Sequence, residues 1–320
     1  MTVDYSSIVR RIPAGFFPIV MGLGGLGQAW RAAARTHAGL APVGDALVLA
    51  AVALWILLCA SYVAKWISAP ELARSEAAHP VSGAFVPLVP ASLLLLLPAL
   101  VPWLGGAGDA LFIALAAVQI AATAWFVARC LGGKLEASAI TPAWHLAVVA
   151  GLLFSGGAAA ALGYLLTGWC FFGAGALAWL AIDSLVFYRL ATQGPLAPLM
   201  RPLLAIELAA PAVVLITYAT LAGGEADALA LGLFGWTLFV AVMLSVLVRW
   251  LCEAPFGAGY WAFTFPAAAL SIAAWRIAQA TASDPALRFA LVLFVVANAV
   301  IGFVAARTLL ALVRGRFLPG

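Results

Sequence analysis

Ten apolar segments, each about 20 residues long, succeed one another along this chain of 320 residues and constrain its fold more than any other feature. A helix of that length crosses the ~30 Å hydrocarbon core of a bilayer and satisfies its own backbone hydrogen bonds there. Only 9% of the residues are charged, against about 25% in soluble domains. We therefore predict an all-α integral membrane protein with a single transmembrane domain over residues 1–320. The predicted spans are 14–34, 45–66, 84–104, 110–130, 143–163, 168–190, 202–222, 227–250, 259–281 and 286–310.

Lys and Arg residues lie mostly on one side of this predicted arrangement. If the N-terminus is cytoplasmic, all but four of the 16 basic residues fall on the cytoplasmic side. The other side has only Arg31, Arg35, Arg276 and Arg288. Because an excess of basic residues marks cytoplasmic loops, we predict a multi-pass membrane protein with both termini in the cytoplasm. The net charge of +4 then reflects orientation in the lipid bilayer, and we expect no nucleic-acid partner.

Helix-disturbing residues occur in every second segment. Even-numbered segments have no interior proline, whereas odd-numbered segments carry proline or paired glycine. These residues are Pro18 in the first segment, Pro87, Pro90 and Pro98 in the third, Gly156 and Gly157 in the fifth, Pro211 in the seventh and Pro266 in the ninth. Proline leaves a helical carbonyl unpaired, which is tolerated in a membrane only where protein or water faces it. We therefore predict five helical hairpins in which the odd helices form an inner ring around a pore and the even helices lie outside. The alternative is that the prolines only mark packing contacts.

The ninth segment contains the run Trp261-Ala262-Phe263-Thr264-Phe265-Pro266. Pro266 is expected to leave the carbonyl of Ala262 without its helical partner and to shift Phe265 away from ideal helical geometry. Because Phe263 and Phe265 are two positions apart, they lie about 200° apart around a helix. Only one of the two rings can face a pore, and Phe265 is the better candidate for a plug.

The first segment resembles the ninth because aromatic rings again precede a proline, in Gly15-Phe16-Phe17-Pro18. Gly22 and further glycines follow within the same segment. Small residues allow helices to approach closely in a membrane. Gly15, Phe17, Pro18 and Gly22 can therefore line the pore or pack against neighbouring helices, and both roles stay open.

Two acidic residues, Asp183 and Glu207, fall inside predicted spans. A carboxylate at the bilayer centre costs about 2.5–3.5 kcal/mol, so each requires an explanation. Each is six residues from a predicted cytoplasmic arginine, Arg189 or Arg201, which is roughly 9 Å along a helix. The two acids can couple transport to protons, bind a cation, or simply form an ion pair or hydrogen bond near the cytoplasmic end.

No set of residues indicates catalysis. The four cysteines and three histidines lack the spacing of metal-binding or redox motifs, and His37, His79 and His145 are each isolated in or near a predicted loop. We therefore predict a protein that is not an enzyme and has neither a metal ion nor a cofactor. An apolar pore with basic residues at its mouths favours small anions that lose their water easily.

Six short motifs are spread in order over essentially the whole chain. They are Pro13-Ala14-Gly15-Phe16-Phe17, His79-Pro80-Val81, Thr141-Pro142, Phe171-Phe172-Gly173-Ala174-Gly175, Gly224-Glu225-Ala226-Asp227 and Trp261-Ala262-Phe263-Thr264-Phe265. Together they resemble the tellurite-resistance/dicarboxylate transporter family, which includes bacterial TehA and the plant guard-cell slow anion channels. The resemblance implies a homotrimer of separate pores, each built from five helical hairpins with the odd helices inside. It also implies that Phe265 occludes the pore as a gate.

These observations predict an anion channel that conducts small inorganic or organic anions passively and is closed by Phe265. The family's assigned substrates differ, so the alternative is a proton-coupled secondary transporter that exports dicarboxylate or tellurite and confers tellurite resistance. In that alternative Glu207 or Asp183 carries the proton. A membrane scaffold or sensor that transports nothing is a third alternative.

Overall fold

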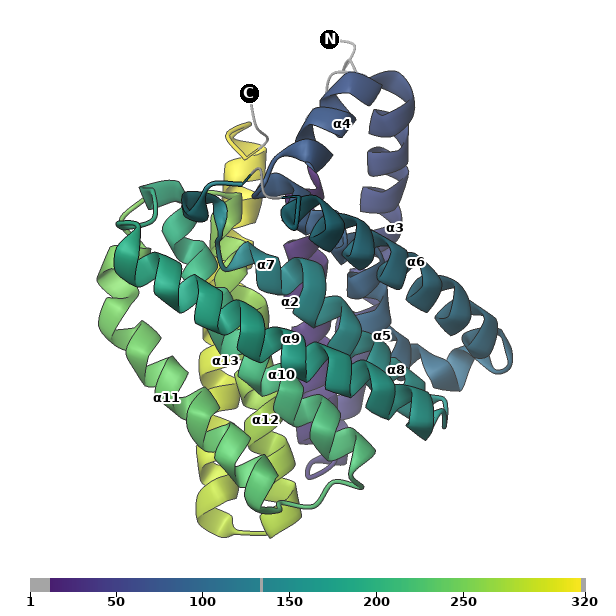
Figure 1. Cartoon of the computed structure of the whole chain (residues 1–320). Coiled ribbons are helices and arrows are strands. Elements are labelled where there is room, and N and C mark those ends of the chain that lie inside the picture. The colour runs from purple at the N-terminus through teal and green to yellow at the C-terminus, as the bar shows by residue number, and fades with distance from the viewer. Residues whose placement is uncertain (1–11, 133–134, 318–320) are drawn as a thin grey trace.

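The computed structural model describes residues 12–132 and 135–317, and Figure 1 shows them as a bundle of long helices. Helices and the turns between them account for this part of the chain, and it contains no strand. The prediction of an all-α protein is therefore confirmed. Arg10, Arg11 and Lys134, which contribute to the predicted cytoplasmic charge, lie outside the described residues.

Long helices coincide with the ten predicted segments. The helices in the odd-numbered segments are α2 (Phe17–Ala34), α5 (Leu88–Leu104), α8 (Gly151–Ala161), α10 (Ile206–Leu221) and α12 (Thr264–Thr281). The helices in the even-numbered segments are α3 (Ala41–Ser68), α6 (Ala107–Cys130), α9 (Leu165–Thr192), α11 (Ala228–Leu251) and α13 (Asp284–Val313). Two shorter α-helices are α4 (Pro70–Ala78), after α3, and α7 (Ala143–His145), which begins the fifth segment.

Nine helical segments of the described chain are long and apolar enough to cross a membrane. The first predicted span, 14–34, is helical as α2 but is not among the nine. Four glycines, together with Gln28 and Arg31, lower the hydropathy of α2. Composition therefore supports nine spans, and the position of α2 is decided by its packing.

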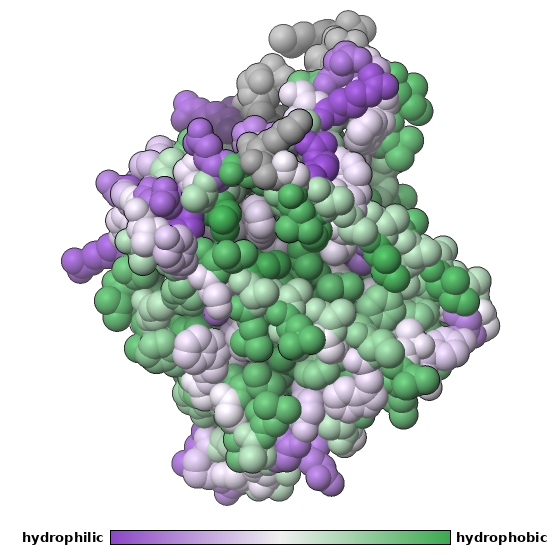
Figure 2. Space-filling view, in the orientation of Figure 1, coloured by the Kyte–Doolittle hydropathy of each residue, from purple (hydrophilic) through white to green (hydrophobic). Residues whose placement is uncertain are grey.

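Burial separates the helices into two groups. In four of the odd-numbered segments most of the membrane-spanning stretch is buried, with 67% in Ser82–Leu104, 72% in Ala143–Ala161, and 78% in both Pro198–Leu221 and Ala258–Thr281. In the even-numbered segments the buried share is only 17% to 33%. Figure 2 shows hydrophobic side chains over the middle of the visible face and hydrophilic side chains gathered toward its two ends. An exposed apolar band of this kind suits contact with lipid.

The more deeply buried helices contact one another in a closed circuit. Helix α2 packs against α5, α5 against α8, α8 against α10, α10 against α12, and α12 returns to α2. Each of them also packs against the long helix that follows it in the chain. Small residues permit the close contact between α2 and α12, because a Cβ added at Gly22 would lie 2.3 Å from Oγ1 of Thr264.

Each of the five buried segments contains helical turns near its start that are not α-helical. Four begin as 3-10 helix, in η1 (Ala14–Phe16), η3 (Ser82–Phe85), η6 (Pro198–Ala205) and η7 (Ala258–Phe263). The fifth segment contains a stretch of π-helix, η5 (Leu146–Ala150), between α7 and α8. Short 3-10 turns are frequent at helix starts, whereas a π-helical turn inside a helix is rare and often marks a functional site.

Most of the prolines predicted to kink helices lie at helix starts. Those at helix starts are Pro18 in α2, Pro87 and Pro90 at α5, and Pro266 in α12. A proline in the first turn costs no intrahelical hydrogen bond, because the N–H groups there have no helical partner. Pro266 also lies in the first turn of α12, because the segment changes from 3-10 to α-helix at Thr264. Pro98 and Pro211 do lie inside α5 and α10.

Candidate functional site

Three cavities follow one another inside the circuit of buried helices. The helix-start cavity, of about 130 Å³, lies among the first turns and is lined by residues such as Gly15 and Gly259. The central cavity, of about 20 Å³, lies between η5, α8 and α10. The helix-end cavity, of about 580 Å³, lies among the later turns of the five buried helices. Phe265 lines all three cavities and so lies at their junction.

The ring of Phe265 is held closely by its neighbours, and the residue is only 6% exposed. Phe154 of α8 meets it edge to face, with ring centroids 5.5 Å apart. On α2, a Cβ added at Gly25 would lie 2.9 Å from Cδ2 of Phe265, so the missing side chain there makes room for the ring. Sequence patterns do not single out Phe154, because a phenylalanine in an apolar span gives no signal of its own.

Phe263 lies in a different environment from Phe265. Its ring packs against Tyr260, with centroids 5.9 Å apart, and the residue is half-buried. It lines none of the three cavities. The two rings thus diverge in the way that their spacing along the helix predicts.

The remaining residues predicted to line the pore or kink its helices fall into two groups. Gly15, Pro18 and Pro266 line the helix-start cavity. The residues that line none of the three cavities are Phe17, Gly22, Pro87, Pro90, Gly156 and Pro211. Some of these pack against other helices: Phe17 meets Tyr62 edge to face at 6.4 Å, and a Cβ at Gly156 would lie 3.2 Å from the carbonyl oxygen of Gly168. Sequence alone does not separate the two groups because both roles favour small and apolar residues.

The helix-end cavity is basic, whereas the other two cavities are lined mainly by apolar side chains. Arg31, Arg35 and Arg276, three of the four basic residues assigned to the non-cytoplasmic side, line it. Arg31 is paired with Asp45, and Nη2 of Arg276 donates a hydrogen bond to Oγ1 of Thr220 at 3.3 Å. Within the described ranges, neither Arg35 nor Arg276 forms an ion pair. Unpaired guanidinium groups around a cavity attract anions.

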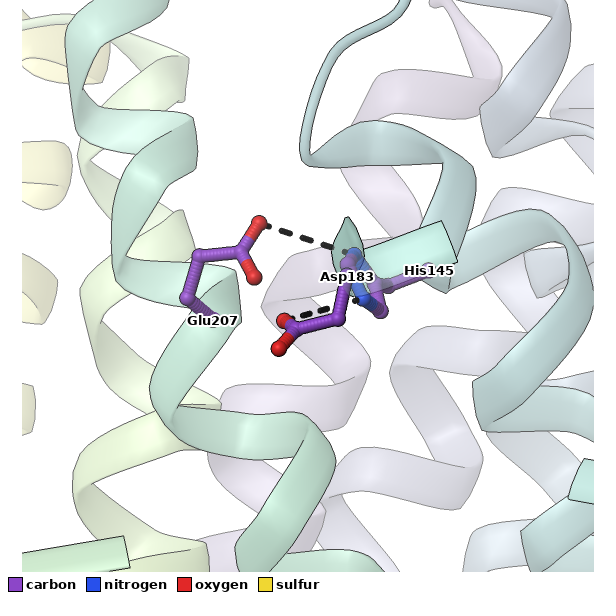
Figure 3. Close-up of side chains that lie close together, drawn as sticks. All are labelled: His145, Asp183 and Glu207. Atoms are coloured by element: carbon purple, nitrogen blue, oxygen red, sulfur yellow. Dashed lines mark ion pairs between the residues drawn. The ribbon is translucent and has the colours of Figure 1, made fainter. Parts of the chain in front are cut away.

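A buried polar cluster lies beside the central cavity. It consists of His145 on α7, Asp183 on α9 and Glu207 on α10, whose side chains point toward one another (Figure 3). Nε2 of His145 is 3.7 Å from Oδ1 of Asp183, and Nδ1 of His145 is 3.6 Å from Oε1 of Glu207. His145 and Glu207 are each 2% exposed. His145 also lines the central cavity together with Phe265.

The cluster corrects the expectation for His145 and identifies the neighbours of the two acids. His145 is not isolated in a loop but lies in a buried helical turn between two carboxylates. The two acids do not pair with the nearby arginines, because Nη1 of Arg189 donates to the carbonyl oxygen of Gly194 at 3.0 Å and Arg201 pairs with Glu253. No local pattern links His145 to the acids, because the three residues come from different segments.

Burying the charged carboxylates of this cluster costs free energy unless a proton or a cation neutralises them. A carboxylate deep in a membrane costs about 2.5–3.5 kcal/mol on insertion scales. Both carboxylate oxygens of Glu207 and Nε2 of His145 have no hydrogen-bond partner in the described structure. Buried polar atoms are rarely left unpaired, so these atoms are suited to receive a proton or a cation.

The fold and these cavities define a helical membrane protein with a largely apolar axis that ends in a basic cavity. The chain belongs to the family described as "Voltage-dependent anion channel", which matches residues 11–309. This is a family of anion channels and transporters, not of enzymes. The resemblance drawn from the sequence motifs is thereby confirmed.

Three relatives are similar over most of the chain. The chain is 30% identical to "Tellurite resistance protein TehA homolog" of Haemophilus influenzae over 316 residues, which are 96% of this chain and 92% of that protein. It is 25% identical to "S-type anion channel SLAH4" of Arabidopsis thaliana over 283 residues, or 85% and 76% of the two chains. It is 24% identical to "Guard cell S-type anion channel SLAC1" of the same plant over 320 residues, or 94% of this chain and 56% of that protein.

Proposed function

We propose that this protein is an anion channel that conducts small anions passively through a central pore in each protomer and is closed by the ring of Phe265. The observation that carries the proposal is the position of Phe265 at the junction of the three cavities. An apolar ring at such a junction blocks a hydrated ion, and its rotation joins the cavities into one path.

The proposed pore wall consists of α2, α5, α8, α10 and α12, with the even-numbered helices facing lipid. The closed circuit of contacts and the alternation in burial support this arrangement. Helix α2 is then the tenth span, since its contacts with α5 and α12 require it to cross with them. Its low hydropathy is tolerated because protein covers most of it.

The charge distribution favours anions over cations. Arg35 and Arg276 raise the local concentration of anions at the helix-end cavity. The path beyond it is largely apolar, so an anion must give up part of its hydration shell to pass. The channel should therefore prefer anions that lose water easily.

Replacement of Phe265 tests the proposed gate. Phe265→Ala should raise anion current several-fold in planar bilayers reconstituted with purified protein. Phe263→Ala is the matched control, because Phe263 lines none of the cavities, and its current should stay near that of the wild type. Unchanged current in folded Phe265→Ala protein would exclude the gate.

A second candidate function is a proton-coupled exporter of dicarboxylate or tellurite. The buried cluster of His145, Asp183 and Glu207 favours it, because a buried carboxylate without a hydrogen-bond partner is suited to carry a proton. The name of the Haemophilus influenzae relative also refers to tellurite resistance. Flux into vesicles that requires a pH gradient and disappears in Glu207→Gln would support the exporter over the channel.

We further place the protein in a bacterial inner membrane, as a homotrimer with both termini in the cytoplasm. The asymmetry of basic residues supports the orientation, and the family resemblance supports the trimer. Native mass spectrometry in detergent should give three chains per particle. Cysteine labelling at the exposed Arg74 position should succeed only from the cytoplasmic side.

A further inference from the structure

We propose that His145, Asp183 and Glu207 form a binding site for one divalent transition-metal ion, of the Zn²⁺ type, buried between α7, α9 and α10. The site does not depend on the proposed channel activity. It differs from the sequence prediction of no metal site, because only tertiary packing brings the three residues together.

The ligand atoms of the cluster are available. Nδ1 of His145 lies 3.3 Å from the carbonyl oxygen of Pro142, which accepts a hydrogen bond if the proton is on Nδ1. Nε2 then carries the lone pair, and it has no hydrogen-bond partner. Histidines that bind metals usually donate their other N–H to a backbone carbonyl or a carboxylate in this way. Both oxygens of Glu207 are also unpartnered.

The geometry is closer to that of metal ligands than to that of hydrogen-bonded partners. The distance of 3.7 Å between Nε2 of His145 and Oδ1 of Asp183 is too long for a hydrogen bond. Two ligands bound to one tetrahedral Zn²⁺ lie about 3.4 Å apart, given bonds of about 2.1 Å. One ligand atom from each of the three residues, counting either ring nitrogen of His145, lies within 4.8 Å of the others. Oε1 of Glu207 lies 3.6 Å from Nδ1 of His145, so the Glu207 side chain must rotate toward Nε2 to share one ion with Asp183.

The charge of the cluster fits a divalent cation. Two carboxylates and a neutral imidazole carry a charge of −2, and among the described residues no Lys or Arg pairs with Asp183 or Glu207. A buried charge requires a partner of opposite charge, and the +2 charge of a divalent ion equals the −2 charge of the cluster. Imidazole as one ligand favours a transition metal over Mg²⁺ or Ca²⁺, which prefer oxygen ligands.

Metal analysis of the purified protein tests the site. The protein is purified in detergent with its affinity tag removed, stripped with a chelator, incubated with Zn²⁺ and passed through a desalting column. Elemental analysis should give about one Zn²⁺ per chain. His145→Ala and Glu207→Gln should lose this zinc, whereas His37→Ala, a substitution at an exposed histidine, should retain it.

Two further measurements test the site even if the substitutions at His145 or Glu207 prevent folding. Zn²⁺ should raise the Tm of the wild type but not that of Asp183→Asn, whose side chain is 14% exposed and therefore the least disruptive of the three to replace. Crystals of the wild type grown with Zn²⁺ should show an anomalous-scattering peak between the three side chains. Wild-type protein that holds no more zinc than His145→Ala, or a crystal without that peak, would overturn the proposal and leave protons to neutralise the cluster.

Discussion

Phe154 of α8 meets Phe265 of α12 edge to face, with ring centroids 5.5 Å apart and ring planes at 86°. The pair joins two helices on different sides of the cavity axis, and both rings line the helix-end cavity. An edge-to-face pair contributes about 0.5–1.5 kcal/mol beyond its buried area. Phe154 should therefore help to hold the ring of Phe265 in the position seen here.

Replacing Phe154 should loosen the proposed gate without removing the ring of Phe265. Phe154→Ala is expected to increase the open fraction of the channel by about 2- to 13-fold, the ratio that corresponds to the energy of the ring pair. Single-channel recording measures the open fraction, and the increase in open fraction should be smaller in Phe154→Ala than in Phe265→Ala. A Phe154→Ala channel that opens no more often than the wild type would show that the ring pair does not hold the gate.

Gly25 should be sensitive to substitution because it lies against the ring of Phe265, the proposed gate. A Cβ there would lie 2.9 Å from Cδ2 of Phe265 and 3.1 Å from Cβ of Ala268, so Gly25→Ala should displace the ring and change the current. Gly302→Ala on α13, where nothing lies within 4 Å of the added Cβ, should behave as the wild type.

A double variant tests whether Gly25 acts through Phe265. In the Phe265→Ala background the contact with the ring is absent, so Gly25→Ala should add little to the current. Additive effects of the two substitutions would indicate that Gly25 acts on helix packing instead.

Arg276 should contribute to anion selectivity. It lines the helix-end cavity without an ion-pair partner in the described chain, so Arg276→Gln should lower the permeability ratio of anion to cation. The reversal potential under a salt gradient measures the ratio, most clearly at low ionic strength. Arg288→Gln is the control, since Arg288 is on the same predicted side but outside the cavity; an equal change in both variants would argue against a role for the cavity.

The ion pair between Lys65 of α3 and Glu76 of α4 should stabilise the start of the bundle. The two side chains are only 4% and 10% exposed, and Oε1 of Glu76 also accepts the N–H of Ala14 at 2.6 Å. Lys65→Met should therefore destabilise the protein by about 3 kcal/mol, because it leaves a buried carboxylate unpaired. Thermal unfolding in detergent measures the loss.

The exposed pair of Arg74 and Glu71 provides the control for this prediction. Its side chains are 64% and 87% exposed, so solvent screens the interaction and Arg74→Gln should change the Tm very little. Equal losses in the two variants would indicate that burial of the Lys65 pair is not what stabilises the fold.

The positions of the helical segments followed from the sequence with good accuracy. The predicted span 202–222 covers α10 (Ile206–Leu221), and 110–130 covers most of α6 (Ala107–Cys130). These were predictable because length and apolar composition are local properties of the chain. The first span is harder to predict from hydropathy, because α2 is less apolar than a typical span and its position depends on contacts with other helices.

Phe265 could be selected from the sequence, but its surroundings could not. The spacing to Phe263 and the position before Pro266 indicated which ring faces the axis. The roles of Phe154 and Gly25 depend on which turns of α2, α8 and α12 come together. The role of Pro266 also depended on the structure, because the helix type changes just before it.

The sequence by itself determined that this protein is a bundle of apolar helices, which of them carry prolines, and to which family it belongs. Each of these follows from residues that are neighbours in the chain. Only the tertiary structure decided that three cavities meet at Phe265 and that His145, Asp183 and Glu207 share one buried site. The physical reason is that contacts between parallel helices depend on the rotation and height of each helix, and these are set by packing of the whole bundle.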